Sequence, residues 1–319
     1  MKRVVLITGG LGYIGSQLIR DAMLSAPPDL QLRVVDNFHR ECWQALAQLP
    51  PGKELQFLEG DILDPLAMRR ALEGVHSVIH LAALVRTPFS FDHPEWTQQV
   101  NHWGTARLVE ICLEMGIARL VFASSASVYG SGGPYAETDS PQALGPYSQA
   151  KLEAEKIVEF ARGRGLPGCI LRLSTVYGWA PAMRFDAMPN RLAFLAATGR
   201  SLVLHGGGDQ IRPILHVRDA SSALLWALEA DVATDGLFNV VAENVSVSEV
   251  VAVLRDLRPQ VKLRHSGQDA LTRISTSVSS DRLLAAGWRP GVGLADGLRE
   301  ILNRFSGISS PATDWPAAN

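Results

Sequence analysis

The chain has 319 residues, of which 47% are hydrophobic and 19% are charged, and its formal net charge is −2. This composition is typical of an ordinary globular protein, and the absence of a basic stripe argues against binding to nucleic acid or to a membrane surface. The length suits one large α/β domain or a larger domain that carries a smaller lobe, and we expect the second arrangement.

Short apolar runs alternate with helical patterns in the first half of the chain. Strands are predicted at residues 4–7, 32–35, 56–58, 77–81, 120–123 and 169–173. Helices are predicted at residues 13–26, 65–72, 95–115 and 147–163. Because the strands are apolar throughout, they fit a parallel sheet that is covered on both faces. The pattern therefore predicts an α/β fold with a doubly wound parallel sheet of the Rossmann type.

The pattern becomes less regular after about residue 180. Shorter elements are predicted there at residues 189–198, 202–204, 217–230, 238–240 and 246–257. We expect a first domain at residues 1–179, with a returning segment near 205–240, and a smaller C-terminal α/β lobe at 180–305. Residues 306–319 lack periodicity and are predicted to form a flexible tail.

The segment before the first strand is too short for a signal peptide, and no run approaches the roughly 18 apolar residues that span a bilayer. We therefore expect a cytoplasmic protein. The three cysteines, Cys42, Cys112 and Cys169, lack the paired spacing of a zinc site. They are predicted to be buried thiols, and no metal site is expected.

A glycine-rich turn follows the first strand. Gly9, Gly12 and Gly15 lie between this strand and an amphipathic helix. Such a turn exposes backbone N–H groups at a helix N-terminus, where the helix dipole favours a pyrophosphate. A tight strand-to-helix turn without a ligand is the alternative interpretation.

Asp36 ends the second strand, about 20 residues after the glycine turn, where a carboxylate can accept hydrogen bonds from an adenine ribose. The same carboxylate would repel a 2′-phosphate, which favours NAD over NADP. The nearby Arg33, His39 and Arg40 leave use of both cofactors open.

Tyr147 and Lys151 are four residues apart at the start of a predicted helix, so their side chains share one face. A lysine ammonium within about 4–6 Å and the positive nicotinamide of an oxidised cofactor both favour the tyrosine phenolate, which can then act as a general base. Ser125 would bind the same substrate oxygen and stabilise its developing charge. Together with the glycine turn, these residues predict hydride transfer at an alcohol carbon.

Further motifs occur in a fixed order along the chain. They are Gly60-Asp61-Ile62, His80-Leu81-Ala82-Ala83, Asn101 with Gly104-Thr105, the serine segment at residues 124–130, and the segments at 171–178, 206–212, 216–219 and 287–290. With these motifs the chain resembles the extended short-chain dehydrogenase/reductase superfamily, specifically the NAD-dependent epimerase/dehydratase family, from Lys2 to about Arg304. Members of that family act largely on nucleotide sugars, so the resemblance implies NAD as cofactor and a nucleotide sugar as substrate.

The resemblance also implies roles for individual residues. Cofactor contacts are expected from Gly9, Gly12, Tyr13, Ile14, Gly15, Asp36, Asn37, Asp61, Ile62, Leu81, Ala82, Ala83, Asn101, Ser124, Tyr147, Lys151 and Ser174. Substrate contacts are expected from Thr87, Ser125, Thr175, Asn190, Arg191 and Arg212. Arg212 is the residue expected to meet a diphosphate, because a forked guanidinium suits that charge; a salt bridge within the second lobe is the alternative. His80 and His216 are expected to be structural rather than catalytic.

Three departures from the family pattern bear on the reaction. Dehydratases of the family carry an Asp-Glu pair directly after the active-site hydroxyl residue, where this chain has Ala126 and Ser127, so elimination and decarboxylation are not favoured. Thr175 stands where the family usually has an asparagine. Residues 265–269 replace an Arg-Pro-Gly-Asp stretch, so either Arg264 or Arg273 must supply the missing cation, or the substrate carries no diphosphate.

The leading hypothesis is an NAD-dependent epimerase that acts at C4 of a UDP-hexose through a transient keto-sugar. Ser125, Tyr147 and Lys151 are its catalytic residues. The nearest alternative is an NAD-dependent dehydrogenase or reductase of a sugar or other secondary alcohol, and a nucleotide-binding regulator without chemistry is a third. By resemblance, the helices at residues 95–115 and 147–163 are expected to pair two copies of the chain into a homodimer.

Overall fold

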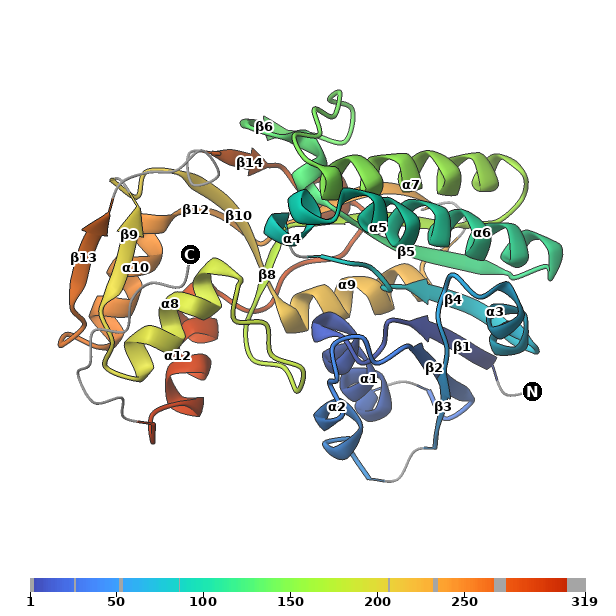
Figure 1. Cartoon of the computed structure of the whole chain (residues 1–319), viewed down its shortest axis with the longest axis horizontal. Helices are drawn as coiled ribbons and strands as arrows, with labels where there is room; N and C mark the ends of the chain where they lie inside the picture. Colours follow the sequence, from blue (N-terminus) through green and yellow to red (C-terminus); the bar gives the residue numbers. More distant parts are fainter. Residues whose placement is uncertain are drawn as a thin grey trace.

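The computed structural model describes residues 3–25, 27–51, 54–85, 87–205, 207–231, 235–266 and 274–308. Figure 1 shows two unequal parts, a larger one around a central sheet and a smaller one that contains most of the C-terminal elements. None of the described helices combines the length and the hydropathy that are needed to span a bilayer.

The larger part is built on a seven-stranded parallel sheet with the order β11-β7-β5-β4-β1-β2-β3. Its strands are β1 (Arg3–Thr8), β2 (Leu30–Asp36), β3 (Leu55–Glu59), β4 (Val75–His80), β5 (Arg119–Ser125), β7 (Gly168–Leu173) and β11 (Gly236–Val240). The direction of strand addition reverses between β1 and β4, whose last residues, Thr8 and His80, are paired. Ligands of doubly wound sheets bind at such a switch point, beside the carboxyl ends of the strands.

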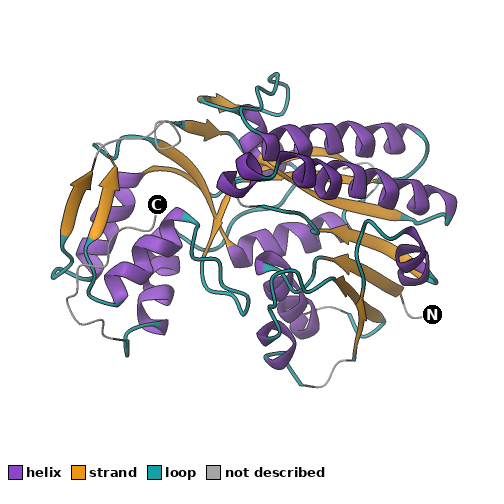
Figure 2. Ribbon diagram, viewed as in Figure 1, coloured by secondary structure: helices purple, strands orange, loops and turns teal. Residues whose placement is uncertain are grey.

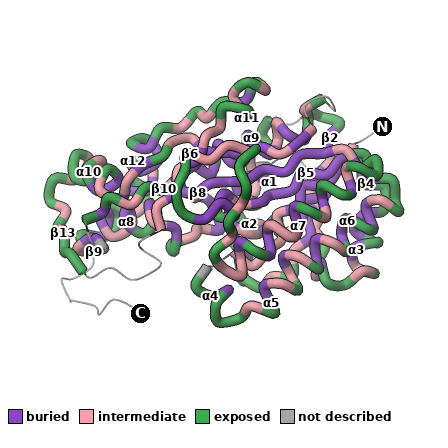
Figure 3. The backbone as a smooth tube through the Cα atoms, turned by 90° about the horizontal axis from the view of Figure 1, so that it is seen from above, coloured by how far each residue is buried: buried purple, intermediate pink, exposed green. Residues whose placement is uncertain are grey.

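Helices cover both faces of this sheet, as Figure 2 shows. One face packs against α1 (Tyr13–Ser25) and α9 (Val217–Glu229), and the other against α3 (Pro65–Leu72), α6 (Thr105–Glu114) and α7 (Pro146–Gly163). Two separate apolar clusters result, one on each side of the sheet, and the strands between them are buried in Figure 3. The predicted α/β doubly wound fold is confirmed.

Local sequence explains where several helices begin. The Asp64 side chain accepts hydrogen bonds from the backbone N–H groups of Leu66 and Ala67 (2.9 and 3.1 Å), and Pro65 occupies the first helical position of α3. α10 (Val247–Leu257) begins with a reciprocal capping box between Ser246 and Glu249.

The helix predicted at residues 95–115 is interrupted. The segment consists of α5 (Pro94–Gln98), a π-helical turn η1 (Gln99–Gly104) and α6. Gly104 lies against Ile62, and a Cβ at position 104 would come within 2.6 Å of the Ile62 Cδ1 atom. A π-turn of six residues has no distinct side-chain periodicity. The sequence pattern therefore predicted one uninterrupted helix at residues 95–115, and this prediction is wrong at residues 99–104.

The smaller part contains a three-stranded sheet, a two-stranded sheet and three helices around their own apolar cluster. Its elements are β8 (Thr175–Tyr177), β9 (Leu202–His205), β10 (Ile211–His216), β12 (Glu243–Ser246), β13 (Leu263–Ser266), α8 (Met188–Ala197), α10 and α12 (Leu294–Arg304). β8, β10, β12, β13 and α12 were not expected from the sequence. Four of them are strands of three to six residues, for which apolar alternation is a weak signal.

The remaining described elements are short. They are α2 (Gln44–Ala47), α4 (Thr87–Asp92), the 3₁₀ turn η2 (Ala126–Tyr129), the strands β6 (Gly132–Tyr135) and β14 (Thr276–Val278), and α11 (Asp281–Ala285). The chain returns from the smaller part to the large sheet through α9 and β11. The domain boundary at residue 179 stays a prediction.

A buried ion pair joins α7 to the sheet. The Arg172 guanidinium of β7 donates to both carboxylate oxygens of Glu155 on α7, with distances of 2.7 to 3.2 Å, and both side chains are almost fully buried. Glu155 also accepts a hydrogen bond from the Ser124 hydroxyl of β5. A charged pair in this position requires both partners, because removal of one leaves an uncompensated buried charge.

We predict that Glu155→Gln lowers the free energy of unfolding by about 3–5 kcal/mol, because Arg172 then stays buried without its counter-charge. Glu159→Gln on the same helix is the matched control, since it breaks only the exposed pair with Arg162 and should cost less than about 1 kcal/mol. Denaturant unfolding measures both. Equal losses for the two variants would contradict this account.

Candidate active site

A large cleft runs between the carboxyl ends of the sheet and the smaller part, with a cavity volume of about 1840 Å³. Pockets for one small molecule usually enclose about 300–1,000 Å³. The cleft therefore has room for a dinucleotide together with a second ligand.

The glycine turn forms one end of the cleft. Gly9 adopts a φ of +67°, and a Cβ there would lie 2.6 Å from the Ala82 Cα atom, while one on Gly15 would lie 2.5 Å from the Gly10 carbonyl oxygen. These two glycines are required by packing. At Gly12 a Cβ would meet only the Gly9 carbonyl oxygen, at 3.2 Å, so the remaining space faces the cleft. This is the geometry in which a pyrophosphate can approach the backbone.

Asp36 lies beside the turn and is oriented by the backbone. Its two carboxylate oxygens accept hydrogen bonds from the N–H groups of Leu11 and Phe38, each at 3.0 Å. Burial raises the pKa of Asp36, and these hydrogen bonds oppose the rise. Asn37 follows, and its amide donates to the Asp61 carboxylate at 2.8 Å. Two predicted cofactor residues, from the loops after β2 and β3, thus contact each other on the cleft wall.

Lys151 is held beneath the cleft floor at the end of β5. Its Nζ donates to the Ala123 carbonyl oxygen at 2.8 Å and lies 4.8 Å from the centre of the Phe122 ring. Only 3% of the residue is exposed, and burial lowers its pKa to about 8, an effect that the negative charge of Glu155 opposes. The ammonium can therefore exchange its proton near neutral pH more readily than an exposed lysine.

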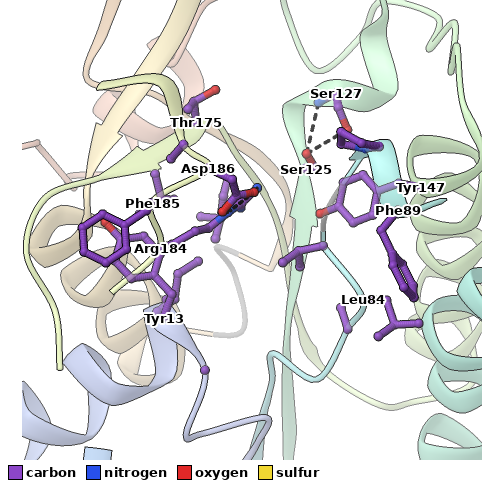
Figure 4. A pocket seen from close by; sticks show the side chains of 18 of the residues that line it. Tyr13, Leu84, Phe89, Ser125, Ser127, Tyr147, Thr175, Arg184, Phe185 and Asp186 are labelled. Carbon is purple, nitrogen blue, oxygen red and sulfur yellow. Dashed lines mark hydrogen bonds and ion pairs between the residues drawn. The ribbon is translucent and has the colours of Figure 1, made fainter. Parts of the chain in front are cut away.

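Tyr147 lies one turn before Lys151 on α7 and faces Ser125, as Figure 4 shows. Burial raises the pKa of Tyr147, while the positive charge of Arg184 and hydrogen bonding to Ser125 lower it. The Ser125 Oγ atom accepts from the Ser127 backbone N–H at 3.2 Å and lies 2.9 Å from the Ser127 hydroxyl oxygen. The structure therefore brings together the three predicted catalytic residues, and it adds Ser127 as a second hydroxyl beside them.

The opposite wall comes from the loop between β8 and α8, which contains Arg184 and Asp186 (Figure 4). The Arg184 Nε and Nη2 atoms bind the Asp186 carboxylate at 3.0 to 3.1 Å. This pair was not predicted, because nothing in the sequence shows that the loop folds back toward Tyr147.

Several predicted residues lie on the cleft wall. They are Gly9, Gly12, Tyr13, Ile14, Gly15, Asp36, Asn37, Asp61, Ile62, Leu81, Ala82, Ala83, Ser124, Ser125, Tyr147, Lys151, Ser174, Thr175, Arg191 and Arg212. The Ser174 hydroxyl is buried and has no hydrogen-bond partner among the described residues. A ligand in the cleft can supply that partner.

Asn101 and Asn190 do not lie on the cleft wall, although both were predicted to contact a ligand. Both are fully buried. The Asn190 amide bonds the Gly178 N–H, the Tyr13 hydroxyl and the Arg184 carbonyl oxygen, at 2.8 to 3.1 Å, so it supports the wall from behind. The side chain of Thr87 and residue 273 are outside the described part of the chain.

The part of the cleft bordered by the smaller lobe is rich in cations. Its lining includes Arg191, Arg200, Arg212, Lys262 and Arg264. Three of these, Arg200, Lys262 and Arg264, were not assigned to the site from the sequence, although Arg264 was one of two candidates for a missing cation. Burial lowers the pKa of Arg212, yet a guanidinium remains charged at any physiological pH.

His80 lies behind the glycine turn and is almost fully buried. Its Nδ1 atom is 2.7 Å from the Thr8 hydroxyl oxygen, and its Nε2 atom is 2.9 Å from the Thr105 hydroxyl oxygen. Burial and the positive charge of Lys151 lower its pKa to about 3. A neutral, hydrogen-bonded imidazole in this position is structural, as the sequence predicted.

The sequence model of the NAD dependent epimerase/dehydratase family matches residues 5–240. The chain belongs to this family. An uncharacterized UDP-glucose epimerase, YtcB of Bacillus subtilis (strain 168), is 29% identical, with 95% of this chain and 98% of that protein covered.

Two solved structures extend the likeness over the whole fold. MoeE5, in complex with UDP-glucuronic acid and NAD, is 30% identical with a TM-score of 0.82, and 94% of this chain and 97% of that chain are covered. The UDP-glucose 4-epimerase of Thermus thermophilus, in complex with NAD, is 27% identical with a TM-score of 0.82, and the coverage is 95% and 99%. Matched relatives also include a nucleotide-sugar decarboxylase and a dehydratase.

The protein is thus an NAD-dependent enzyme of the extended short-chain dehydrogenase/reductase type, related to nucleotide-sugar epimerases, dehydratases and decarboxylases. The glycine turn, the space at Gly12 and the buried Ser174 hydroxyl all fit NAD as its cofactor.

The low pKa of His80 predicts a loss of stability in acid. Below pH 6.5 the unfolded chain binds a proton at this histidine, whereas the folded protein does not until about pH 3. Protonation thus favours the unfolded state as the pH falls from 6.5 toward 3, by about 2 kcal/mol at pH 5.

We therefore expect that the free energy of unfolding falls by about 2 kcal/mol more between pH 7 and pH 5 in the wild type than in His80→Asn. Urea unfolding at the two pH values measures this difference. The exposed His93→Asn is the control for removing a histidine. If His80→Asn keeps the full pH dependence, the buried imidazole is not its source.

Proposed function

We propose that this enzyme is an NAD-dependent nucleotide-sugar 4-epimerase that acts on a UDP-hexose. The observation that carries the proposal is the set of groups around the Tyr147 hydroxyl. Ser125 and Ser127 present hydroxyls, and Ala126 stands between them, so this segment offers no carboxylic acid to expel a leaving hydroxyl. Oxidation followed by reduction of the same carbon needs none.

Asp186 lines the opposite wall, where Arg184 binds its carboxylate through Nε and Nη2. It does not belong to the segment after Ser125, in which this chain has Ala126 and Ser127 instead of acids.

In the proposed reaction Tyr147, as phenolate, takes the proton of the substrate hydroxyl while Ser125 donates a hydrogen bond to the same oxygen. NAD supplies the hydride acceptor and later the donor. The hydrogen leaves the carbon with its electron pair, which gives a keto-sugar. After the sugar has turned, Tyr147 returns the proton to the oxygen as hydride reaches the opposite face of the carbon. Lys151 stabilises the phenolate through its charge.

The cationic lining of the smaller lobe supports a substrate with a diphosphate. Arg191, Arg200, Arg212, Lys262 and Arg264 can neutralise its charge, and arginine forks suit phosphate oxygens. Arg264 is thus our candidate for the cation that the sequence pattern lacked.

The alternative is a dehydrogenase or reductase that uses the same residues and releases reduced cofactor. Purified enzyme with substoichiometric NAD should convert UDP-glucose or UDP-glucuronic acid to its 4-epimer, visible by NMR, without accumulation of NADH. NADH in proportion to an oxidised product would establish the dehydrogenase instead. No reaction with either sugar nucleotide would contradict the proposed substrate class.

Tyr147→Phe should lower kcat about 10²- to 10⁴-fold, because the general base is lost while the ring remains. NAD affinity should stay within a few fold of the wild-type value. Tyr135→Phe, in β6 outside the cleft, is the matched control and should keep full activity. A fully active Tyr147→Phe would remove Tyr147 from the proposed mechanism.

We further propose a homodimer through α6 and α7. The two helices lie side by side (Figure 1). Trp103, in η1 just before α6, is 61% exposed, and Phe160 on α7 is 65% exposed. Large exposed aromatic side chains are typical of interfaces.

Light scattering at micromolar concentration should therefore give twice the chain mass, and Trp103→Glu with Phe160→Glu should give the mass of one chain. Leu24→Glu on α1 is the control, since Leu24 is 66% exposed on the opposite face of the sheet. A wild-type protein with the mass of one chain would exclude this dimer.

A further inference from the structure

A chain of buried hydrogen bonds links the glycine turn to the cleft loop at residues 81–85. Thr8 contacts His80, His80 contacts Thr105, and the Thr105 hydroxyl donates to the Asn101 carbonyl oxygen at 2.7 Å. The Asn101 amide then bonds Leu84 twice, accepting from its N–H at 2.7 Å and donating to its carbonyl oxygen at 2.8 Å.

The donor and the acceptor of each of these hydrogen bonds can be assigned. Because the Thr105 hydroxyl donates to a carbonyl, it must accept from His80, so the imidazole carries its proton on Nε2. Nδ1 is then an acceptor for the Thr8 hydroxyl. The Thr8 oxygen in turn accepts from the Ala82 N–H at 3.4 Å, which closes the ring on the same loop. We call Thr8, His80, Thr105 and Asn101 the polar ring.

The loop at residues 81–85 has no regular secondary structure, yet it lines the cleft. At its start, Leu81 donates its N–H to the Thr8 carbonyl oxygen at 3.1 Å. At Leu84, both backbone polar groups bind the Asn101 side chain, as they would bind a neighbouring strand. Thr8 thus holds the start of this cleft wall, and Asn101 holds its far end.

Asn101 lies inside the π-turn η1, and Thr105 begins α6. From there the Asn101 amide contacts Leu84, and the Thr105 hydroxyl contacts His80. π-turns of this kind are frequent at functional sites.

We propose that His80, Thr105 and Asn101 are positioning residues for NAD, which hold the 81–85 loop in the form that receives the cofactor. The inference rests on the NAD site described above. It assigns no contact with NAD to these three residues, in contrast to the cofactor contact that the sequence predicted for Asn101.

The chain offers a matched pair of variants. Thr105 and Thr198 are both buried, and each donates its hydroxyl to the carbonyl oxygen four residues earlier, at 2.7 and 2.9 Å. Valine at either position removes that bond, but only Thr105→Val opens the polar ring. Thr105→Ser keeps the hydroxyl and serves as the conservative rescue.

NAD affinity is measured by calorimetric titration of protein freed of bound nucleotide. Thr105→Val should weaken binding about tenfold, the effect of one lost buried hydrogen bond. Thr105→Ser and Thr198→Val should stay within about threefold of the wild type. Equal NAD affinity of Thr105→Val and the wild type would overturn this inference and leave the cofactor site in place. A wild-type protein that does not bind NAD would overturn the cofactor site as well.

A second measurement needs no variant. If Asn101 holds Leu84 in the absence of ligand, the Leu84 amide should exchange its hydrogen far more slowly than an unprotected loop amide, in mass-spectrometric exchange of the wild type. Exchange at the unprotected rate would overturn the inference.

Discussion

The attachment of α7 to the sheet is the constraint on which the rest of the site depends. This helix directs a lysine and a glutamate, one turn apart, into the buried layer above β5 and β7. Lys151 bonds the Ala123 carbonyl oxygen, and Glu155 bonds Ser124 and Arg172. Buried charges tolerate little displacement, because each loses its partner when the helix moves. The helix is therefore fixed in rotation and height, and Tyr147 is fixed opposite Ser125.

The second wall of the cleft is tied to the first through a small polar cluster. The Tyr13 hydroxyl at the start of α1 donates to the Gly178 carbonyl oxygen at 2.6 Å, and Asn190 bonds both Tyr13 and the loop that carries Arg184. The glycine turn and the loop opposite Tyr147 thus share one anchor. These hydrogen bonds hold the cofactor end and the substrate end of the cleft in a fixed position relative to each other.

The sequence predicted the parts of this site that depend on local chemistry. The glycine turn, Asp36 and the pair Tyr147 and Lys151 follow from short spacings within one strand, turn or helix, and the structure places all of them on one cleft. The parts it did not predict depend on tertiary packing. Arg184 reaches the cleft through a loop without periodicity, and Asn190 turns inward because Tyr13 and Gly178 offer it partners. Gly104, at the end of the π-turn, packs against Ile62, which is distant in sequence.

In the proposed reaction one carbon of the substrate is oxidised and then reduced with the same hydrogen. The most direct measurement uses a UDP-hexose with deuterium at C4 and follows the 4-epimer by mass spectrometry and NMR. The account predicts that deuterium remains at C4 of the product, because the hydrogen passes to NAD and back without contact with water. Replacement of the deuterium by solvent hydrogen would contradict it.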